Sequence, residues 1–335
     1  MEEKALKEEI IALGRRLHEL RLAVARGGNL SSRVDKDTMF ITATSTSLGQ
    51  LNEADIIKAD VTHPANVEHK RLSTEFPLHR AIYKNFMEAN RVIHCHPALT
   101  NAYFSVYDDL DVLTFETKLY LGNVPVVKQF TPSITNPQEV IDALKTNNIV
   151  AIKNHGVVAV GNTFTDALYL IEGLEEAVRM AGVAMLFKKE VINPFEAELK
   201  KDLSIPMPKP VYEMFSPGHI EAIVGLVNKD EFIAQKGAEL DLTVELAIKL
   251  LEQPEGAYTF CFEKGKIVKV EQRDTAPFVI SASGEVWRHV FLGKLDPFVG
   301  TIQGKMKLKG ELIKLSRWYL PFTRLFALFK EVRIK

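Results

Sequence analysis

The chain has 335 residues, enough for two ordinary domains, and its 42 basic and 43 acidic side chains nearly cancel, which argues against broad nucleic-acid binding. An apolar fraction of 46% argues against a disordered chain, and the two cysteines, Cys95 and Cys261, do not make a disulfide framework. Residues 1–16 are charged and lack a signal-peptide core, and no run of about eighteen apolar residues predicts a membrane span, so we expect a cytoplasmic protein.

The first half of the chain alternates between helical and strand patterns. Apolar residues three and four positions apart predict an amphipathic helix from Leu6 to Val24, ended by Gly27 and Gly28. The later segments expected here are strands near 30–34 and 39–44, a helix near 78–88, an apolar strand before Pro97, strands at 149–153 and 157–160, and a long helix at 163–189 whose N-cap is Thr163.

A proline-rich stretch separates the two halves. Prolines at 194, 206, 208, 210 and 217 occur among charged residues without an apolar period, which predicts domains at 1–195 and 218–335 joined by a linker at 196–217. The second half is expected to contain two helical stretches over 219–253, a hairpin of 258–262 and 267–270, a strand at 277–282, a helix at 283–292 and a strand at 301–309.

Three histidines form the most informative pattern. His94 and His96 stand in an apolar strand, so they share one face while Cys95 points to the other as a small buried residue. His155 lies between two β-branched runs, at the tip or shoulder of a hairpin. Three neutral imidazoles can hold a divalent metal and leave a fourth position open, although any one of them alone is more often a packed residue.

Groups suited to a phosphate and to proton transfer accompany these histidines. Glu75 stands at a helix start, where Pro77 is tolerated in the first turn. Hydroxyls, an amide and backbone N–H groups at helix starts are what an anionic phosphate needs, and they occur at 27–33, 42–47 and 73–74. Together these features suggest carbanion chemistry on a phosphorylated sugar, in which a metal polarises a carbonyl and holds the enediolate while Glu75 moves the proton.

In their order and spacing, these motifs resemble the class II aldolase/adducin family, which includes L-fuculose-phosphate aldolase and L-ribulose-phosphate 4-epimerase. The resemblance covers about residues 1–195 and rests on Gly28-Asn29-Leu30-Ser31, Ile41-Thr42-Ala43-Thr44-Ser45, Ser73-Thr74-Glu75, His94-Cys95-His96-Pro97 and Asn154-His155-Gly156. It implies an α/β domain with a central, mainly antiparallel sheet between helix layers, and a tetramer with sites at subunit borders.

The resemblance also assigns roles to individual residues. It implies that His94, His96 and His155 bind zinc or a similar divalent ion, and that Glu75 is the catalytic acid or base. The positions that it matches to the substrate phosphate are Asn29, Thr44, Ser45, Ser73 and Thr74. Without it, Ser73 and Thr74 are also read as N-caps, Asn29 as a turn residue, and His79 as a packed residue four positions after Glu75.

Three departures from the family pattern matter. The family loop Thr-Pro-Thr-Gly or Thr-Pro-Ser-Gly is Thr42-Ala43-Thr44-Ser45 here, which loses the glycine's free access to positive φ. Glu75 matches the aldolases, whereas the epimerases are expected to carry Asp, so the sequence favours carbon–carbon cleavage. The C-terminal tyrosine of the family aldolases has only a positional candidate, Tyr212.

The second half resembles the sterol carrier protein 2 family over about residues 215–335. The match rests on Gly293-Lys294-Leu295-Asp296-Pro297 and Gly304-Lys305-Met306-Lys307-Leu308-Lys309-Gly310-Glu311, together with the hairpin at 258–270. It implies an α+β domain with an apolar cavity for fatty-acyl or sterol-like ligands, whose lining residues the sequence does not identify. A basic, aromatic C-terminal helix is expected either to lie on an anionic membrane or to cover the domain with its basic residues solvated.

The sequence therefore predicts a metal-dependent lyase that reversibly cleaves a ketose phosphate to a ketone phosphate and an aldehyde, fused to a lipid-carrier-like domain. One alternative is a lipid-binding or scaffolding protein whose first domain has lost its enzymatic role, as in the adducins. The other alternative keeps the metal and changes the reaction to epimerisation or decarboxylation.

Overall fold

The computed structural model divides the chain into two compact units, Met1–Val191 and Ile192–Lys335, and each is described by itself. The structure describes residues 2–63, 71–129, 133–134, 136–187, 210–253, 256–310, 315 and 317–335. Most of the predicted linker, 196–209, lies outside these residues, so the domain limits at 195 and 218 stay predictions.

A seven-stranded sheet forms the centre of the first unit, in the order β3-β2-β1-β4-β7-β6-β5. Every neighbouring pair is antiparallel except β5 and β6. The strands are β1 (Asn29–Arg33), β2 (Thr38–Thr42), β3 (Ile56–Asp60), β4 (Arg91–Cys95), β5 (Val126–Lys128), β6 (Ile149–Lys153) and β7 (Gly156–Gly161).

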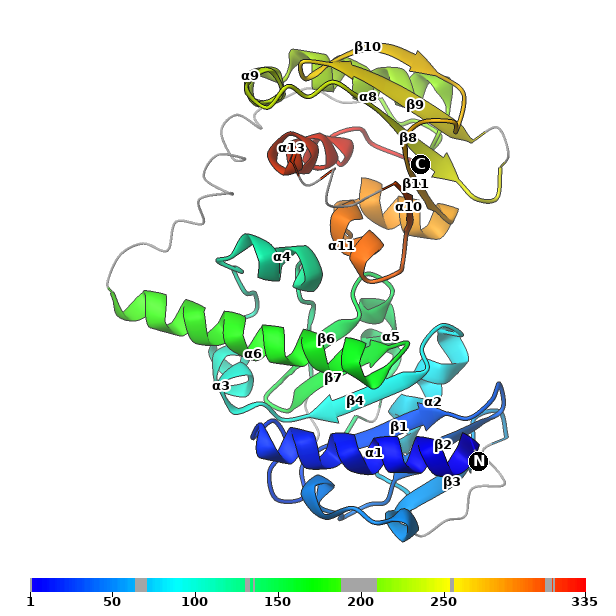
Figure 1. Ribbon diagram of the computed structural model, residues 1–335, viewed down its shortest axis with the longest axis vertical. Coiled ribbons are helices and arrows are strands. Elements are labelled where there is room, and N and C mark those ends of the chain that lie inside the picture. The colour runs from blue at the N-terminus through cyan, green and yellow to red at the C-terminus, as the bar shows by residue number, and fades with distance from the viewer. Residues whose placement is uncertain are drawn as a thin grey trace. The chain divides into compact units, whose positions relative to one another are not determined.

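Helices cover both faces of this sheet (Figure 1). Ile93 and Cys95 of β4 pack with α1 and α6, whereas Val92 packs with α2 and α5 on the opposite face. This alternation confirms the predicted α/β/α arrangement with a mainly antiparallel sheet. The helices are α1 (Glu2–Glu19), α2 (Phe76–Asn85), α3 (Ala98–Val106), α4 (Phe115–Leu121), α5 (Gln138–Leu144) and α6 (Phe164–Leu186), with short 3₁₀ turns at Leu48–Gln50 and Glu53–Asp55.

The first helix is shorter than its apolar period predicts. It ends at Glu19, because Arg21 and Ala25 adopt φ values of 59° and 52°, which a right-handed helix does not allow. Leu22 is buried although it follows the helix, so the apolar spacing in the sequence continues beyond the last helical turn and made the predicted helix too long. The expected helix at 78–88 runs instead from Phe76 to Asn85. The predicted capping box of the long helix is present: the Thr163 side chain accepts from the Asp166 N–H, and the Asp166 carboxylate accepts from the Thr163 N–H.

The second unit is an α+β domain around a five-stranded sheet, in the order β10-β9-β8-β11-β12, in which only β8 and β11 are parallel. The strands are β8 (Val244–Leu250), β9 (Ala257–Glu263), β10 (Lys266–Glu271), β11 (Phe278–Ala282) and β12 (Lys307–Lys309). The helices are α8 (Pro217–Lys229), α9 (Glu231–Glu239), α10 (Gly284–Phe291), α11 (Pro297–Ile302) and α13 (Tyr319–Phe329).

Two expectations for the second unit are wrong. Residues 244–250 form the central strand β8 rather than a helix. Leu246, Ile248 and Leu250 are buried on one face, and Glu245 and Lys249 on the other face are only partly buried, which is the two-residue period of a strand. The strand predicted at 301–309 is reduced to 307–309, because Asp296 caps a helix by accepting from the N–H groups of Phe298 and Val299.

The C-terminal helix α13 packs into its own unit. Phe322, Leu325 and Phe329 are buried there, which favours the covering role over a membrane-surface role. Arg324 is not solvated as expected: it is buried and forms an ion pair with Asp230, with nitrogen–oxygen distances of 2.7 and 2.8 Å. Within the described residues, no helix has the length and apolar character needed to span a bilayer.

Candidate metal and phosphate site

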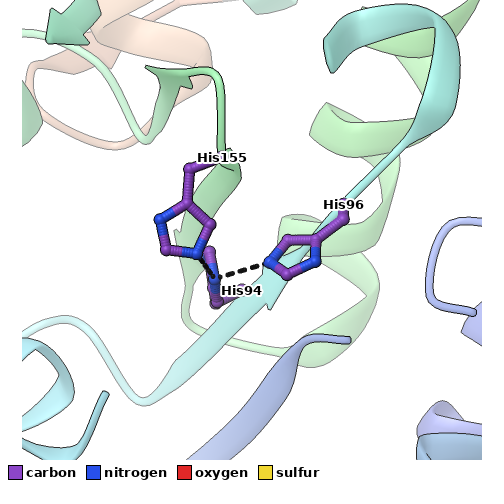
Figure 2. Close-up of side chains that lie close together, drawn as sticks. All are labelled: His94, His96 and His155. Carbon is purple, nitrogen blue, oxygen red and sulfur yellow. Dashed lines mark hydrogen bonds between the residues drawn. The ribbon is translucent and has the colours of Figure 1, made fainter. Parts of the chain in front are cut away.

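Three imidazoles from two segments meet in the first unit (Figure 2). The Nε2 atom of His94 lies 3.1 Å from Nε2 of His96 and 3.2 Å from Nε2 of His155. His94 and His96 come from the end of β4 and the residue after it, and His155 comes from the turn between β6 and β7. Within the described residues, this is the one group of three or more His, Cys, Asp or Glu side chains close enough to hold a metal ion.

The hydrogen bonding of His94 leaves a lone pair directed at this meeting point. Its Nδ1 lies 3.0 Å from the carbonyl oxygen of Val157, which can only accept, so Nδ1 carries the proton and Nε2 is bare. Tetrahedral coordination with zinc–nitrogen bonds of about 2.0–2.1 Å places ligand nitrogens roughly 3.3 Å apart. The observed separations of 3.1 and 3.2 Å therefore fit a divalent metal bound by three neutral imidazoles.

Glycines provide the space for the His96 ring. A Cβ atom on Gly27 would lie 2.8 Å from Nδ1 of His96, and one on Gly156 would lie 2.6 Å from its Cδ2. Gly28 has a φ of 85°, and its Cβ would lie 2.7 Å from the carbonyl oxygen of His94. Glycine is therefore needed at 27, 28 and 156, because any side chain there would collide with His96 or with the backbone of β4.

A left-handed residue and a side-chain hydrogen bond fix the turn that carries His155. Asn154 adopts a left-handed φ of 61°, which asparagine tolerates better than most residues. The amide Nδ2 of Asn101 in α3 donates to the carbonyl oxygen of His155 at 3.0 Å. The Nδ1 atom of His155 is buried and has no hydrogen-bond partner among the described residues.

Burial keeps these histidines neutral. It lowers the pKa of His94 well below its usual value, and the neighbouring His96 and His155 lower that pKa further. Burial also lowers the pKa of His96, and it lowers the pKa of His155 to about 4. Near pH 7 all three rings are therefore in the form that donates a lone pair to a metal.

Glu75 precedes α2 without capping it. Both of its carboxylate oxygens accept from the N–H of Ile134, at 3.1 and 3.2 Å. The side chain is buried, and this desolvation raises the pKa of Glu75, while the hydrogen bond from Ile134 acts in the opposite direction. Ser73 Oγ accepts from the Glu75 N–H at 3.2 Å, two residues on, in the turn before the helix. The N-cap position of α2 is Glu75, so the N-cap alternative for Ser73 and Thr74 is wrong.

The two hydroxyl-rich segments lie side by side. The N–H of Thr44 donates to the carbonyl oxygen of Arg71 at 2.8 Å, and Ala43 forms a bridge with Leu72. These contacts hold 42–45 against 71–74, so four of the five predicted phosphate residues belong to one pair of adjacent segments.

Ser45 keeps the backbone conformation that its sequence left in doubt. Its φ is 60°, in the left-handed region that the glycine of the family loop reaches freely. Such a conformation costs a non-glycine residue about 1–2 kcal/mol. The loop therefore has a left-handed residue at this position and carries an exposed serine side chain where a glycine is expected.

Asn29, the fifth predicted phosphate residue, lies next to the histidines. It stands in β1 directly opposite His94 of β4, so the two side chains are cross-strand neighbours on one face. Tyr212, by contrast, belongs to the second unit, where its N–H donates to the carbonyl oxygen of Arg333.

Sequence reasoning missed the contacts of His79. The residue is fully buried, as a packed histidine should be, but its ring bonds to Ser31 Oγ at 2.6 Å and to Asn29 Oδ1 at 2.5 Å. The only sequence signal was its place one helical turn after Glu75, because its partners lie 48 and 50 residues earlier in the chain.

Each half of the chain matches the model of a known protein family. Residues 8–181 match the family model of the class II aldolase and adducin N-terminal domain, and residues 234–318 match that of the SCP-2 sterol transfer family. The L-fuculose phosphate aldolase of Methanocaldococcus jannaschii is 30% identical over 183 residues, which are 55% of this chain and 99% of that protein.

Other relatives have a different named reaction. The 3-oxo-tetronate 4-phosphate decarboxylase of Haemophilus influenzae is 29% identical over 187 residues, which cover 54% of this chain and 88% of that protein. Among solved structures, L-fuculose-1-phosphate aldolase from Thermus thermophilus is 26% identical with a TM-score of 0.51, over 55% of this chain and 95% of that one.

Proposed function

The chain belongs to the class II aldolase and adducin N-terminal domain family over residues 8–181, and we propose that it is a metal-dependent lyase acting on a phosphorylated ketose. The reaction is reversible cleavage to a ketone phosphate and an aldehyde. The observation that carries this proposal is the meeting of three neutral imidazoles with their Nε2 atoms 3.1 and 3.2 Å apart.

His94, His96 and His155 hold zinc or a similar divalent ion. When bound, the ion supplies Lewis-acid polarisation of the substrate carbonyl. The protein's part is to fix the three rings: the Val157 carbonyl sets the tautomer of His94, and Asn101 holds the turn of His155. The neutral side chains leave the charge of the ion undiminished.

Glu75 transfers the proton. In the cleavage direction the hydroxyl group that becomes the aldehyde loses its proton as the carbon–carbon bond breaks, and Glu75 supplies a proton to the carbon left behind. In the reverse direction Glu75 removes that carbon-bound proton, and the aldehyde oxygen gains one. A buried carboxyl with a raised pKa is suited to this task, because its pKa lies closer to neutral pH than that of a solvated glutamate.

Asn29, Thr44, Ser45, Ser73 and Thr74 bind the substrate phosphate. Support comes from the contacts that hold 42–45 against 71–74 and from the position of Asn29 opposite His94. Binding energy at a phosphate remote from the reacting carbons holds the substrate in register for proton transfer.

A panel of sugar phosphates, L-fuculose 1-phosphate among them, tests the proposal with zinc-loaded protein. We expect aldehyde release from at least one ketose phosphate and loss of this activity in Glu75→Gln, which should keep its metal and no longer exchange the substrate proton with solvent. Glu116→Gln, at the exposed start of α4, is the matched control. Full activity of Glu75→Gln would remove Glu75 from the mechanism.

Decarboxylation of a sugar-acid phosphate is the second candidate, favoured by relatives such as the decarboxylase of Haemophilus influenzae. It needs the same metal and phosphate sites but a carboxylate on the substrate. Carbon dioxide release from 3-oxo-tetronate 4-phosphate, without aldehyde release from any ketose phosphate, would replace the aldolase assignment.

The second unit has an SCP2-like domain, for which the proposed ligand is a fatty-acyl or sterol-like molecule. Support comes from the match of residues 234–318 to the SCP-2 sterol transfer family. Mass spectrometry of an organic extract of the purified protein should find stoichiometric lipid. Lipid without metal would favour the scaffolding alternative, and the absence of lipid would contradict the carrier role.

Assembly into a homo-oligomer, a tetramer by family expectation, completes the proposal. Its support is a group of exposed apolar side chains towards the end of α6, which would be covered by another copy: Val183, Leu186 and Phe187. Light scattering on the purified chain measures the assembly directly, and a monomer would contradict this part.

A further inference from the structure

A chain of buried polar groups connects strand β1 with helix α2. Tyr83 Oη lies 2.9 Å from Ser31 Oγ, Ser31 Oγ lies 2.6 Å from His79 Nδ1, and His79 Nε2 lies 2.5 Å from Asn29 Oδ1. All four side chains are buried, and His79 and Ser31 are 0% exposed. Asn29 is the member of the chain that neighbours His94.

With Oδ1 of Asn29 directed at His79, the types of atom fix the direction of the hydrogen bonds in this series. The amide oxygen of Asn29 can only accept, so Nε2 of His79 carries the ring proton. Because His79 is neutral, Nδ1 then accepts from the Ser31 hydroxyl, and Ser31 Oγ accepts from the Tyr83 hydroxyl. The Tyr83 hydroxyl has one proton and lies closer to Ser31 Oγ, at 2.9 Å, than to the carbonyl oxygen of Asn90, at 3.4 Å. Burial lowers the pKa of His79 to about 3, which is consistent with a ring that carries one proton.

This direction decides which edge of the Asn29 amide is left for a ligand. With Oδ1 bound to His79, the two N–H groups of Nδ2 are free of partners among the described residues. The opposite amide orientation would present an oxygen instead, which repels an anion. Turning the Asn29 amide over would therefore replace the N–H groups that can donate to a phosphate with an oxygen that repels it.

Arg33 also joins strand β1 to helix α2, the two elements that carry these hydrogen-bonded residues. Its Nε donates to the carbonyl oxygen of Ala89, and one terminal nitrogen donates to those of Tyr83 and Phe86, at 2.8–3.0 Å. Asn29, Ser31 and Arg33 alternate along β1 and so share the face towards α2. Glu75, His79 and Tyr83 recur four residues apart and share one stripe of the helix sequence.

We propose that His79 is a positioning residue, which holds the Asn29 amide so that Nδ2 donates to the phosphate of the substrate. Ser31, which is itself hydrogen-bonded to Tyr83, fixes the tautomer of His79 by donating to Nδ1 of its ring. This inference rests on the proposed phosphate role of Asn29, and it assigns function to a helix side chain that itself makes no contact with substrate.

Titration calorimetry of the full-length chain with inorganic phosphate tests the proposal. Asn29→Ala and His79→Leu should each weaken phosphate binding by about tenfold, the lower end of what a hydrogen bond to a charged group contributes. The double variant should bind no more weakly than the weaker single variant, because both remove the same interaction. With sugar phosphate, His79→Leu should raise KM more than it lowers kcat.

His79→Gln is the conservative rescue, since its amide also offers one donor and one acceptor, and it should bind phosphate within about twofold of the parent. Nitrogen-15 NMR of the unmodified protein gives a readout that does not depend on a variant folding: Nε2 of His79 should be protonated and Nδ1 bare. Tyr83→Phe, which removes only the outermost hydroxyl, should have the smallest effect.

Several results would overturn the proposal. These are a proton on Nδ1 of His79, phosphate affinity unchanged in a folded His79→Leu protein, additive losses in the double variant, or no phosphate binding by the parent. If no sugar phosphate is cleaved but the binding pattern holds, the proposed reaction fails and the positioning role stands. If cleavage occurs and His79→Leu binds phosphate normally, the reverse is true.

Discussion

The two units both bury histidine, in environments of opposite character. In the first unit, His94, His96 and His155 direct ring nitrogens at one shared point. In the second unit, His219 is fully buried beside the Phe291 ring, with a centroid distance of 4.6 Å, and its Nδ1 accepts from the N–H of Phe215. Its Nε2 has no hydrogen-bond partner among the described residues.

The difference shows that burial alone does not identify a functional histidine. Burial lowers the pKa of His155 and of His219 to about 4 in each case. What separates them is convergence: three lone pairs meet in the first unit, whereas His219 meets aromatic rings. Metal binding is therefore expected to depend on His94, His96 and His155, whereas His219 is expected to affect only the acid stability of the second unit.

The largest expected effect is the loss of metal in His155→Ala. Removing one of three ligands should lower metal affinity by more than about 100-fold, the upper end of what the loss of an outer-sphere partner costs. Elemental analysis of the purified protein measures it. His219→Phe, which removes the other kind of buried histidine, should keep its metal. Unchanged metal in His155→Ala would refute the ligand assignment.

The second prediction concerns acid stability. The pKa of His219 is depressed in the folded state, so the unfolded chain binds a proton first as the pH falls below about 6.5, and this lowers the free energy of unfolding by about 3 kcal/mol by pH 4. Above about pH 6.5 the contribution is fully present. His219→Phe should remove this part of the pH dependence.

Tryptophan fluorescence is a selective readout for that measurement. The only two tryptophans, Trp287 and Trp318, both belong to the second unit. Denaturant titrations of the parent and His219→Phe at several pH values give the difference. Parallel pH profiles for the two proteins would contradict the prediction.

A smaller effect is expected from Gly156→Ala in the first unit. The new methyl group would collide with the carbonyl oxygen of Cys95 and lie 2.6 Å from Cδ2 of His96, so the end of β4 and the His96 ring must shift. We expect metal affinity to fall by about tenfold, as when a partner that orients a ligand is lost. Gly182→Ala is the matched control, because a Cβ there meets nothing within 4 Å. Equal metal affinity in the two variants would contradict the crowding argument.

The smallest effect is expected at Ser45. Ser45→Gly relieves the left-handed conformation but frees the unfolded chain, for a net gain of about 0.5 kcal/mol in the free energy of unfolding. Ser45→Ala keeps the strain, so it should not be stabilised, although both variants lose the hydroxyl and should bind phosphate less well. Thermal unfolding and phosphate titration separate the two effects. A stabilised Ser45→Ala would show that φ is not the cause.

Local rules were reliable where the determining residues are adjacent. The alternation of His94, Cys95 and His96 placed the imidazoles on one face and the thiol on the other. The capping box at Thr163 and the two-residue turn at Lys264 and Gly265 also followed from neighbouring residues. The helix predicted at 244–250 was wrong, although this segment has the two-residue alternation of a strand, because the helical period of the preceding residues was extended into it.

By itself, the sequence determined the three candidate ligands, the strand that carries His94, and the two families to which the halves are related. Only the tertiary structure decided that His155 reaches His94 across 61 residues, that Ile134 donates to Glu75, and that His79 is hydrogen-bonded to Asn29. The physical reason is that hydrogen-bond direction and close approach depend on distances between segments. The order of residues along one segment does not specify those distances.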